Sequence, residues 1–252
     1  MTTQSQQTER VKSTKRLARI AGVLYLLIAI FSTFALVGVD GRVYVPGDGA
    51  TTAANVVANA ELVRLGVVAD LFQATVFMFL AMIMYRLFKH VHTSATNAMV
   101  VLVAIAVGIM CLDAVFRFMS LRVATESAYA AGFGPAGVNA MVLLLMETQH
   151  YGYLIAQIFY GLWLVPLGYL AYTSRLFPRA LAVVLIVGGA CYILDLLVRF
   201  LAPDLGGRIH GFVVIPPTIA EVWTLGYLLI KGIRTPRKTV GQVPVVPVPA
   251  PA

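Results

Sequence analysis

Long stretches without charge decide the fold, and the first of them, Ile20–Val39, reads IAGVLYLLIAIFSTFALVGV. Its 20 residues are enough to cross a hydrocarbon core of about 30 Å as an α-helix. The run is longer than the apolar region of a typical secretory signal peptide, and it lacks a clear A-x-A cleavage site. We therefore predict an uncleaved first membrane span.

Five more apolar stretches follow along the chain. They predict spans at Leu62–Leu87, Ala98–Leu121, Tyr151–Tyr172, Ala180–Leu201 and Phe212–Ile230. Hydrophobic residues make up 60% of the chain and charged residues only 12%, whereas a soluble domain needs about 25% charged residues. The sequence thus predicts an all-α fold, a polytopic transmembrane helical bundle of about six spans. The apolar stretch of the fourth span begins as early as Met141, which predicts a long or tilted helix or a preceding interfacial segment.

The two ends of the chain differ in composition from the six-span domain, which we place at residues 20–233. Residues 1–19 are polar and basic, and we expect a disordered tail there. Residues 234–252 repeat proline and valine and predict an extended, solvated tail.

Basic residues predict the orientation. They concentrate in both tails and in the loops after the second and fourth spans, while the opposite loops hold only Arg42, Arg122 and Arg208. Because cytoplasmic loops are rich in Lys and Arg, we expect both termini in the cytoplasm and the protein in the cell (cytoplasmic) membrane. The net charge of +8 does not predict a nucleic-acid partner, since no phosphate-binding loop or RNA-binding motif is present. The lipid bilayer is the expected partner, and the oligomeric state stays open.

One pattern occurs twice. Leu112–Phe118 in the third span and Leu194–Phe200 in the fifth both read L-D-x-x-x-R-F, and the cytoplasmic loop before each of these spans contains Arg-Leu-Phe. The pattern predicts a parallel duplication of a two-helix hairpin, made of spans two and three and of spans four and five. Chance similarity between two apolar helices is the alternative.

Ionisable residues inside the spans are the candidate functional residues, because a charge near the bilayer centre costs about 2.5–3.5 kcal/mol. They gather toward the non-cytoplasmic ends of the spans, which predicts a polar cavity opening away from the cytoplasm. The candidate ligand-binding residues are Asp70, Asp113, Arg117, Glu147, His150, Asp195, Arg199 and Glu221.

Spacing predicts which of these charges are paired. In both copies of the repeat the aspartate and the arginine lie four residues apart on one helix face, so Asp113 should pair with Arg117 and Asp195 with Arg199. Three carboxylates, those of Asp70, Glu147 and Glu221, then lack a partner, unless Arg64 reaches the latter two. Unpaired carboxylates at this depth favour a proton, a metal ion or a cationic or zwitterionic solute over an anion.

Other patterns carry less functional meaning. Glu147 and His150 have the Glu-x-x-His spacing of metal ligands in helix bundles, but no second such motif occurs, so we predict no metal site and no cofactor. The aromatic residues between Tyr151 and Trp163 fit helix packing better than a ligand box. The small residues of Ala104-x-x-x-Gly108 predict close helix contact.

The fourth span carries a resemblance. Gln157–Tyr169 reads QIFYGLWLVPLGY and is followed by Phe177-Pro178-Arg179. From about Arg16 to Ile233 the chain resembles a family of bacterial six-helix membrane proteins catalogued as domain of unknown function number 4386. The resemblance implies a six-helix fold and a bacterial envelope location, and it implies no activity.

Three functions fit these patterns. The leading one is a membrane protein, not an enzyme, that binds or moves a small ligand or proton at an outward-facing polar cavity. The alternatives are an intramembrane enzyme acting on a lipid or lipid-linked substrate, and a structural or accessory subunit whose buried charges only pair helices.

Overall fold

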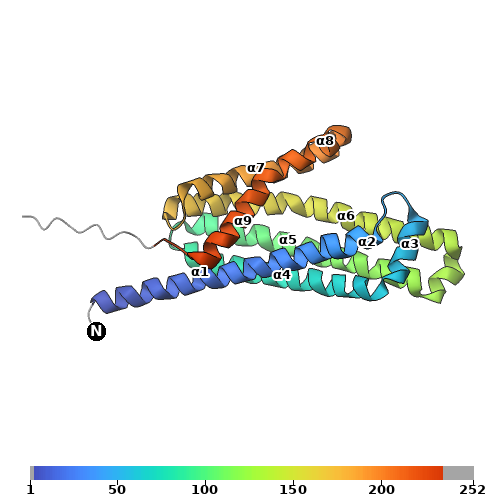
Figure 1. The fold of residues 1–252 in the computed structure, drawn as a ribbon, viewed down its shortest axis with the longest axis horizontal. Helices are drawn as coiled ribbons and strands as arrows, with labels where there is room; N and C mark the ends of the chain where they lie inside the picture. The colour runs from blue at the N-terminus through green and yellow to red at the C-terminus, as the bar shows by residue number, and fades with distance from the viewer. Residues whose placement is uncertain (1–2, 235–252) are drawn as a thin grey trace, which may run out of the picture.

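A computed structural model describes residues 3–234, and all regular structure in that range is helical (Figure 1). The first helical stretch comprises α1 (Thr3–Thr33), the π-helix η1 (Phe34–Asp40) and the single turn α2 (Gly41–Val43). The remaining helices are α3 (Gly49–Ala58), α4 (Ala60–Phe88), α5 (Thr93–Thr125), α6 (Ser127–Ser174), α7 (Arg179–Leu201), α8 (Pro203–Val213) and α9 (Ile215–Ile230). Six helical segments are long and apolar enough to cross a membrane, as the sequence predicts.

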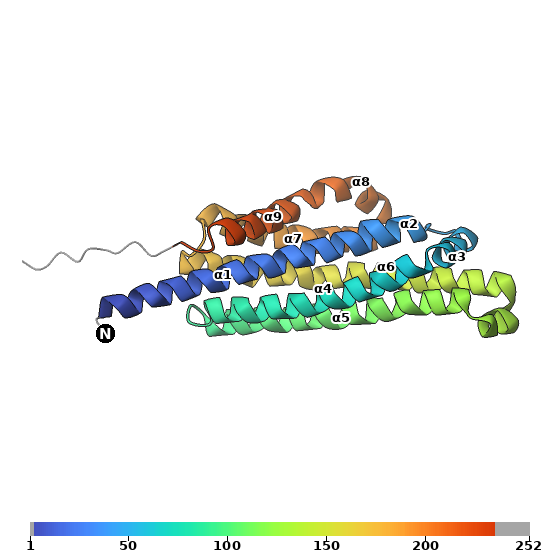
Figure 2. The same ribbon diagram turned by 60° about the horizontal axis from the view of Figure 1, so that its bottom comes forward.

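The six segments form a closed ring in chain order. Helix α4 packs between α1 and α5, α6 between α5 and α7, and α9 between α7 and α1 (Figures 1 and 2). The start of α1 and the end of α9 therefore lie at the same end of the bundle, which we call the terminal end. The opposite end, where α2, α3 and α8 lie, is the far end.

The far end is more ordered than the sequence predicts. Residues 40–61 and 122–150 were expected to be mainly loops, but they form α3 and extended parts of α5 and α6. A separate hydrophobic cluster holds this layer together, and it includes Val39, Val56, Leu121 and Val142. Helix α6 continues from this layer into the membrane span, which supports the long-helix reading of that segment.

Three further features concern the ends and the regularity of the helices. Helix α1 begins at Thr3, whereas composition predicts an unstructured tail up to residue 19. Backbone geometry within α6 departs from helical values at Gly134, whose φ of 66° suits a residue without a side chain. Helix α9 begins with Pro216 and Pro217 in its first turn, where the missing backbone N–H groups cost no helical hydrogen bond. The predicted proline-rich tail lies outside the described residues, apart from Arg234.

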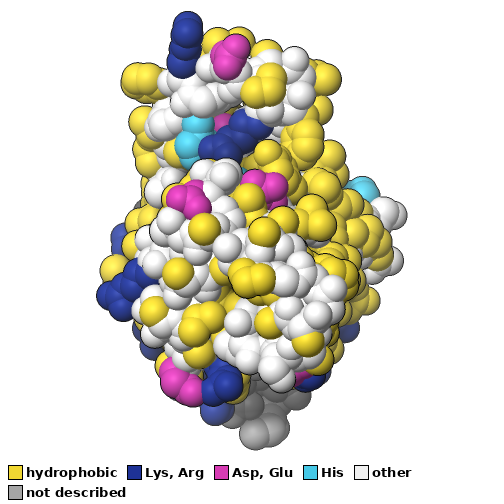
Figure 3. Space-filling model, turned by 90° about the vertical axis from the view of Figure 1, so that its right-hand side faces the viewer, with side chains coloured by type: hydrophobic (Ala, Val, Ile, Leu, Met, Phe, Trp, Pro, Cys, Tyr) yellow, Lys and Arg dark blue, Asp and Glu magenta, His cyan; other side chains and the backbone are white. Residues whose placement is uncertain are grey.

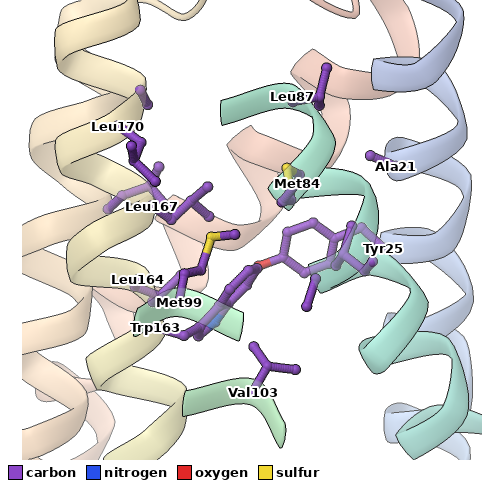
Figure 4. Packing of buried hydrophobic residues seen from close by; sticks show 14 of the residues in the cluster. Ala21, Tyr25, Met84, Leu87, Met99, Val103, Trp163, Leu164, Leu167 and Leu170 are labelled. Atoms are coloured by element: carbon purple, nitrogen blue, oxygen red, sulfur yellow. The ribbon is translucent and has the colours of Figure 1, made fainter. Parts of the chain in front are cut away.

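A hydrophobic cluster fills the ring toward the terminal end. Trp163 is its largest fully buried side chain. It meets the rings of Tyr25 and Phe77 edge-on, at centroid distances of 6.2 and 5.2 Å (Figure 4). Met84 and Met99 add flexible side chains from α4 and α5 to the same cluster. This packing closes the interior of the ring on its terminal side.

Close helix contact occurs at a place other than the predicted one. A Cβ atom at Gly161 would lie 2.6 Å from the carbonyl oxygen of Gly189, and a Cβ at Gly189 would lie 2.5 Å from that of Gly161. These two glycines let the backbones of α6 and α7 approach each other. A Cβ at Gly108 would meet nothing within 4 Å, so the prediction of close packing at Ala104-x-x-x-Gly108 is wrong.

Candidate functional site

A cavity of about 420 Å³ occupies the ring interior toward the far end, and we call it the outer cavity. Residues from α1, η1, α4, α5, α6, α7, α8 and α9 line it, so every helix of the ring contributes. Figure 3 looks onto the far end and shows acidic, basic and histidine side chains gathered below the helix at the top of the view. The predicted clustering of charge at one end is therefore present.

Arg117 is the central cation of this cavity and is only 2% exposed. Its Nε donates to Asp70 at 2.8 Å. Its two terminal nitrogens donate to both carboxylate oxygens of Asp40, with Nη2 at 3.1 Å from Oδ2. Gln149 donates a further hydrogen bond of 3.3 Å to Asp40. One buried guanidinium thus joins η1, α4 and α5, and two carboxylates surround it.

Asp113 is left without that partner. The i,i+4 spacing predicts an ion pair with Arg117, but the guanidinium is directed at Asp40 and Asp70 instead, so this prediction is wrong. Asp113 is 7% exposed, lines the outer cavity and has no hydrogen bond or ion pair among residues 3–234. Gly152 faces its carboxylate so closely that a Cβ at that position would collide with it. Asp113 is therefore a buried acid at the cavity wall, packed against Gly152 of α6.

The second predicted pair is present and is part of a larger group. Asp195 is 1% exposed, and its Oδ2 lies 3.4 Å from Nε of Arg199. Gln157 donates to the same oxygen at 2.9 Å, while Nδ1 of His210 lies 2.9 Å from Oδ1. The geometry with Arg199 is an ion contact without an aligned hydrogen bond, since its buried Nε has no hydrogen-bond acceptor. The group ties α6, α7 and α8 together at the cavity wall.

A smaller space of about 170 Å³, the inner chamber, continues the outer cavity toward the terminal end. The two spaces share six lining residues, among them Ser32, Gln73 and Thr218, so they are adjacent. Glu221 on α9 lines the inner chamber and accepts a hydrogen bond of 3.2 Å from the hydroxyl of Tyr192. The predicted acid on the last span therefore lies in the inner chamber, apart from the charges of the outer cavity.

The structure places the candidate residues unequally. The outer cavity is lined by Asp70, Asp113, Arg117, His150 and Arg199. Glu147 lines neither space, although it is only partly exposed. Arg64 does not reach it, because Arg64 pairs with Glu61 on the surface of α4.

Asp40 and His210 also line the outer cavity, and neither was among the predicted ligand-binding residues. Asp40 directly follows the last residue of the predicted first span, and its position next to the span end was the available signal. His210 is preceded by the glycines and the arginine of α8, which read as a loop. Within the described part of the chain, no three His, Cys, Asp or Glu side chains form a metal-binding group.

The ring and its one-sided cavity define a multi-pass helical membrane protein with a buried polar site. The chain belongs to the family described as "Domain of unknown function (DUF4386)", whose sequence model matches residues 20–232. No curated protein and no solved structure matches the chain.

Proposed function

We propose that the protein binds a small cationic or zwitterionic solute in the outer cavity. The observation that carries this proposal is the carboxylate of Asp113, which is buried at the cavity wall without a hydrogen bond or ion pair among residues 3–234. A lone carboxylate at membrane depth must take up a proton, meet a cation or be hydrated. A volume of about 420 Å³ lies within the range of small-molecule sites, which favours a solute over a bare proton.

The other charges of the cavity agree with this preference. Asp40 and Asp70 share the single guanidinium of Arg117, which leaves that group with one excess negative charge when both acids are ionised. Arg199 is the second arginine that lines the cavity; it makes an ion pair with Asp195, but its side chain is still 25% exposed. A zwitterion is therefore a suitable ligand, since its anionic group has one cation to meet.

Thermal unfolding of the purified protein tests the proposal with three solutes of similar size. Ethanolamine is a cation at neutral pH, glycine a zwitterion and acetate an anion. We expect the first two to raise the melting temperature at constant ionic strength, and Asp113→Asn to abolish that rise. Glu61→Gln is the matched control, because it removes an exposed acid of the surface pair with Arg64. Stabilisation by acetate alone, or an unchanged response of Asp113→Asn, would show that the proposal is wrong.

We also propose that the far end faces away from the cytoplasm and that both termini are cytoplasmic, in the cell membrane. The support is the distribution of basic residues, since the ends of α4 and α6 and the start of α7 at the terminal end carry Arg86, Arg175 and Arg179. Reporter fusions after Gly241 should report cytoplasm, and insertions at Gly47 or Gly134 should report the exterior. An external C-terminus would contradict this orientation and leave the cavity open to the cytoplasm.

A further inference from the structure

Six of the fourteen residues that line the inner chamber are aromatic. They are Tyr25, Phe77, Tyr153, Tyr160, Trp163 and Tyr192. Four of the ring helices supply them, and Figure 4 shows Tyr25 of α1 and Trp163 of α6 reaching toward each other. The sequence assigns the aromatic residues between Tyr151 and Trp163 to helix packing, but three of them also line an open space together with aromatic residues of other helices.

Polar atoms of the chamber lack partners. The hydroxyls of Tyr25 and Tyr160 are buried and make no hydrogen bond in the described part of the chain. Tyr25 is only 6% exposed, and its hydroxyl lies close enough to Glu221 to interact with that carboxylate, although the contact falls short of an aligned hydrogen bond. A buried polar group without a partner is unfavourable, so such groups mark places where a ligand or water completes the site.

Glu221 supplies the charge of the chamber. Its carboxylate is close enough to interact electrostatically with the four tyrosines, and Tyr192 donates to one of its oxygens. Among the residues that line the inner chamber it is the one acid, and no arginine or lysine lines that space. This lining suits a cation better than an anion.

The wall chemistry indicates which kind of cation fits. A magnesium or calcium ion needs six or more oxygen ligands, whereas this chamber offers one carboxylate and a few hydroxyls between aromatic faces. Aromatic faces attract a cation that carries apolar groups, because ring quadrupole and hydrophobic contact then act together. An alkylammonium group satisfies both the carboxylate and the rings.

We propose that the inner chamber is a subsite for an alkylammonium group, which the carboxylate of Glu221 holds against the aromatic wall. This inference rests on the proposed function and deepens it. The solute enters through the outer cavity, where Asp113 attracts it, and its ammonium end comes to rest in the adjacent inner chamber. The ligand class is thus an organic amine with methyl or methylene groups on its nitrogen.

Trp163 offers a direct readout of occupancy. The chain has two tryptophans, and Trp223 lies on the outer surface of α9. In a Trp223→Phe background, all tryptophan emission comes from the chamber wall. N-methylpyridinium is an organic cation that quenches indole fluorescence on contact, so its binding should give saturable quenching. Tetramethylammonium should compete with it, whereas tert-butanol, a neutral molecule of similar shape, and sodium chloride should not.

Variants separate charge from aromatic contact. Glu221→Gln should weaken the affinity for N-methylpyridinium about tenfold or more, because a buried charge partner is lost. Tyr160→Leu should weaken it several-fold, roughly the effect of one cation–π contact, whereas Tyr160→Phe keeps the ring and should stay within about threefold. Tyr160→Phe also removes a hydroxyl without a hydrogen-bond partner, so its fold should be intact.

Failure of this inference is distinguishable from failure of the proposed function. Quenching that does not saturate, or that neither Glu221→Gln nor Tyr160→Leu weakens, would overturn the alkylammonium subsite. If ethanolamine still stabilises the protein in an Asp113-dependent manner, the outer-cavity proposal survives that result. If no ammonium compound changes the melting temperature or the fluorescence, both proposals are wrong.

Discussion

Replacing Arg117 by methionine should cost more stability than any other single loss of charge in the described residues. The guanidinium is 2% exposed and contacts both Asp40 and Asp70. At the 2.8 Å separation of its Nε from Asp70, an effective dielectric constant of about 20 gives roughly 6 kcal/mol of Coulomb attraction. Desolvation offsets part of that attraction, but Arg117→Met leaves two buried carboxylates uncompensated. We expect a loss of about 3–5 kcal/mol.

Unfolding in mixed micelles, by titration with a denaturing detergent, measures this free energy. Arg64→Met is the matched control, because the side chains of Arg64 and Glu61 are 56% and 81% exposed. An exposed pair of this kind contributes under about 1 kcal/mol. Equal losses for the two methionine variants would show that Arg117 is not compensating buried charge.

Double-mutant cycles distinguish the observed partners from the one predicted by spacing. Asp40→Asn or Asp70→Asn combined with Arg117→Met should give a coupling free energy above about 1 kcal/mol, since the removed groups touch. Asp113→Asn combined with Arg117→Met should give a smaller coupling free energy than either of these, because Asp113 interacts with Arg117 through space without a hydrogen bond or ion pair. A larger coupling for Asp113 than for Asp40 would refute the assignment of Arg117 to the carboxylates of η1 and α4.

Two further predictions concern packing and pH. Gly161→Ala should destabilise the protein by about 1–3 kcal/mol in the same unfolding assay, because the new methyl group would collide with the backbone of α7. Gly226→Ala is the control and should be nearly neutral, because its methyl group would meet nothing within 4 Å. The backbone N–H and hydroxyl of Thr51 donate to Asp48 and lower the pKa of that carboxyl below its ordinary value of 3.8. The hydrogen bonds from Thr51 to Asp48 at the start of α3 should therefore be fully present above pH 3.8 and be lost as the pH falls through the lowered pKa. Faster hydrogen exchange at the Thr51 amide would reveal this loss. Exchange that is unchanged at low pH would contradict the prediction.

The number of spans could be predicted because it depends on a property that is local in sequence. Each apolar run is long enough to cross a membrane by itself, and no contact with another helix is needed to recognise it. Residues 40–61 have no such run and contain glycines and polar residues, so α3 was read as part of a loop. Helix α3 is stabilised by the separate hydrophobic cluster at the far end, to which it contributes Val56. That contact depends on the tertiary fold.

The candidate site was predicted in its composition but not in its pairing. The i,i+4 rule identifies neighbours on one helix, and it is right for Asp195 and Arg199. It fails for Asp113 because the long side chain of Arg117 reaches across the ring to carboxylates on two other elements. Which helices lie beside α5 cannot be read from the sequence of α5. The duplicated hairpin inferred from the same repeat stays a prediction.

The contrast between the two halves of the ring bears on how a solute would move. Toward the far end the interior is lined by carboxylates, arginines, amides and hydroxyls, whereas toward the terminal end it is filled by Trp163, Met84 and their apolar neighbours. A pore would need a polar lining or an open path through both halves. Here the path from the far end stops in the inner chamber, where Trp163 forms part of the wall. We infer that this conformation holds a ligand at a blind-ended site, and that any passage across the membrane requires the apolar cluster to separate first.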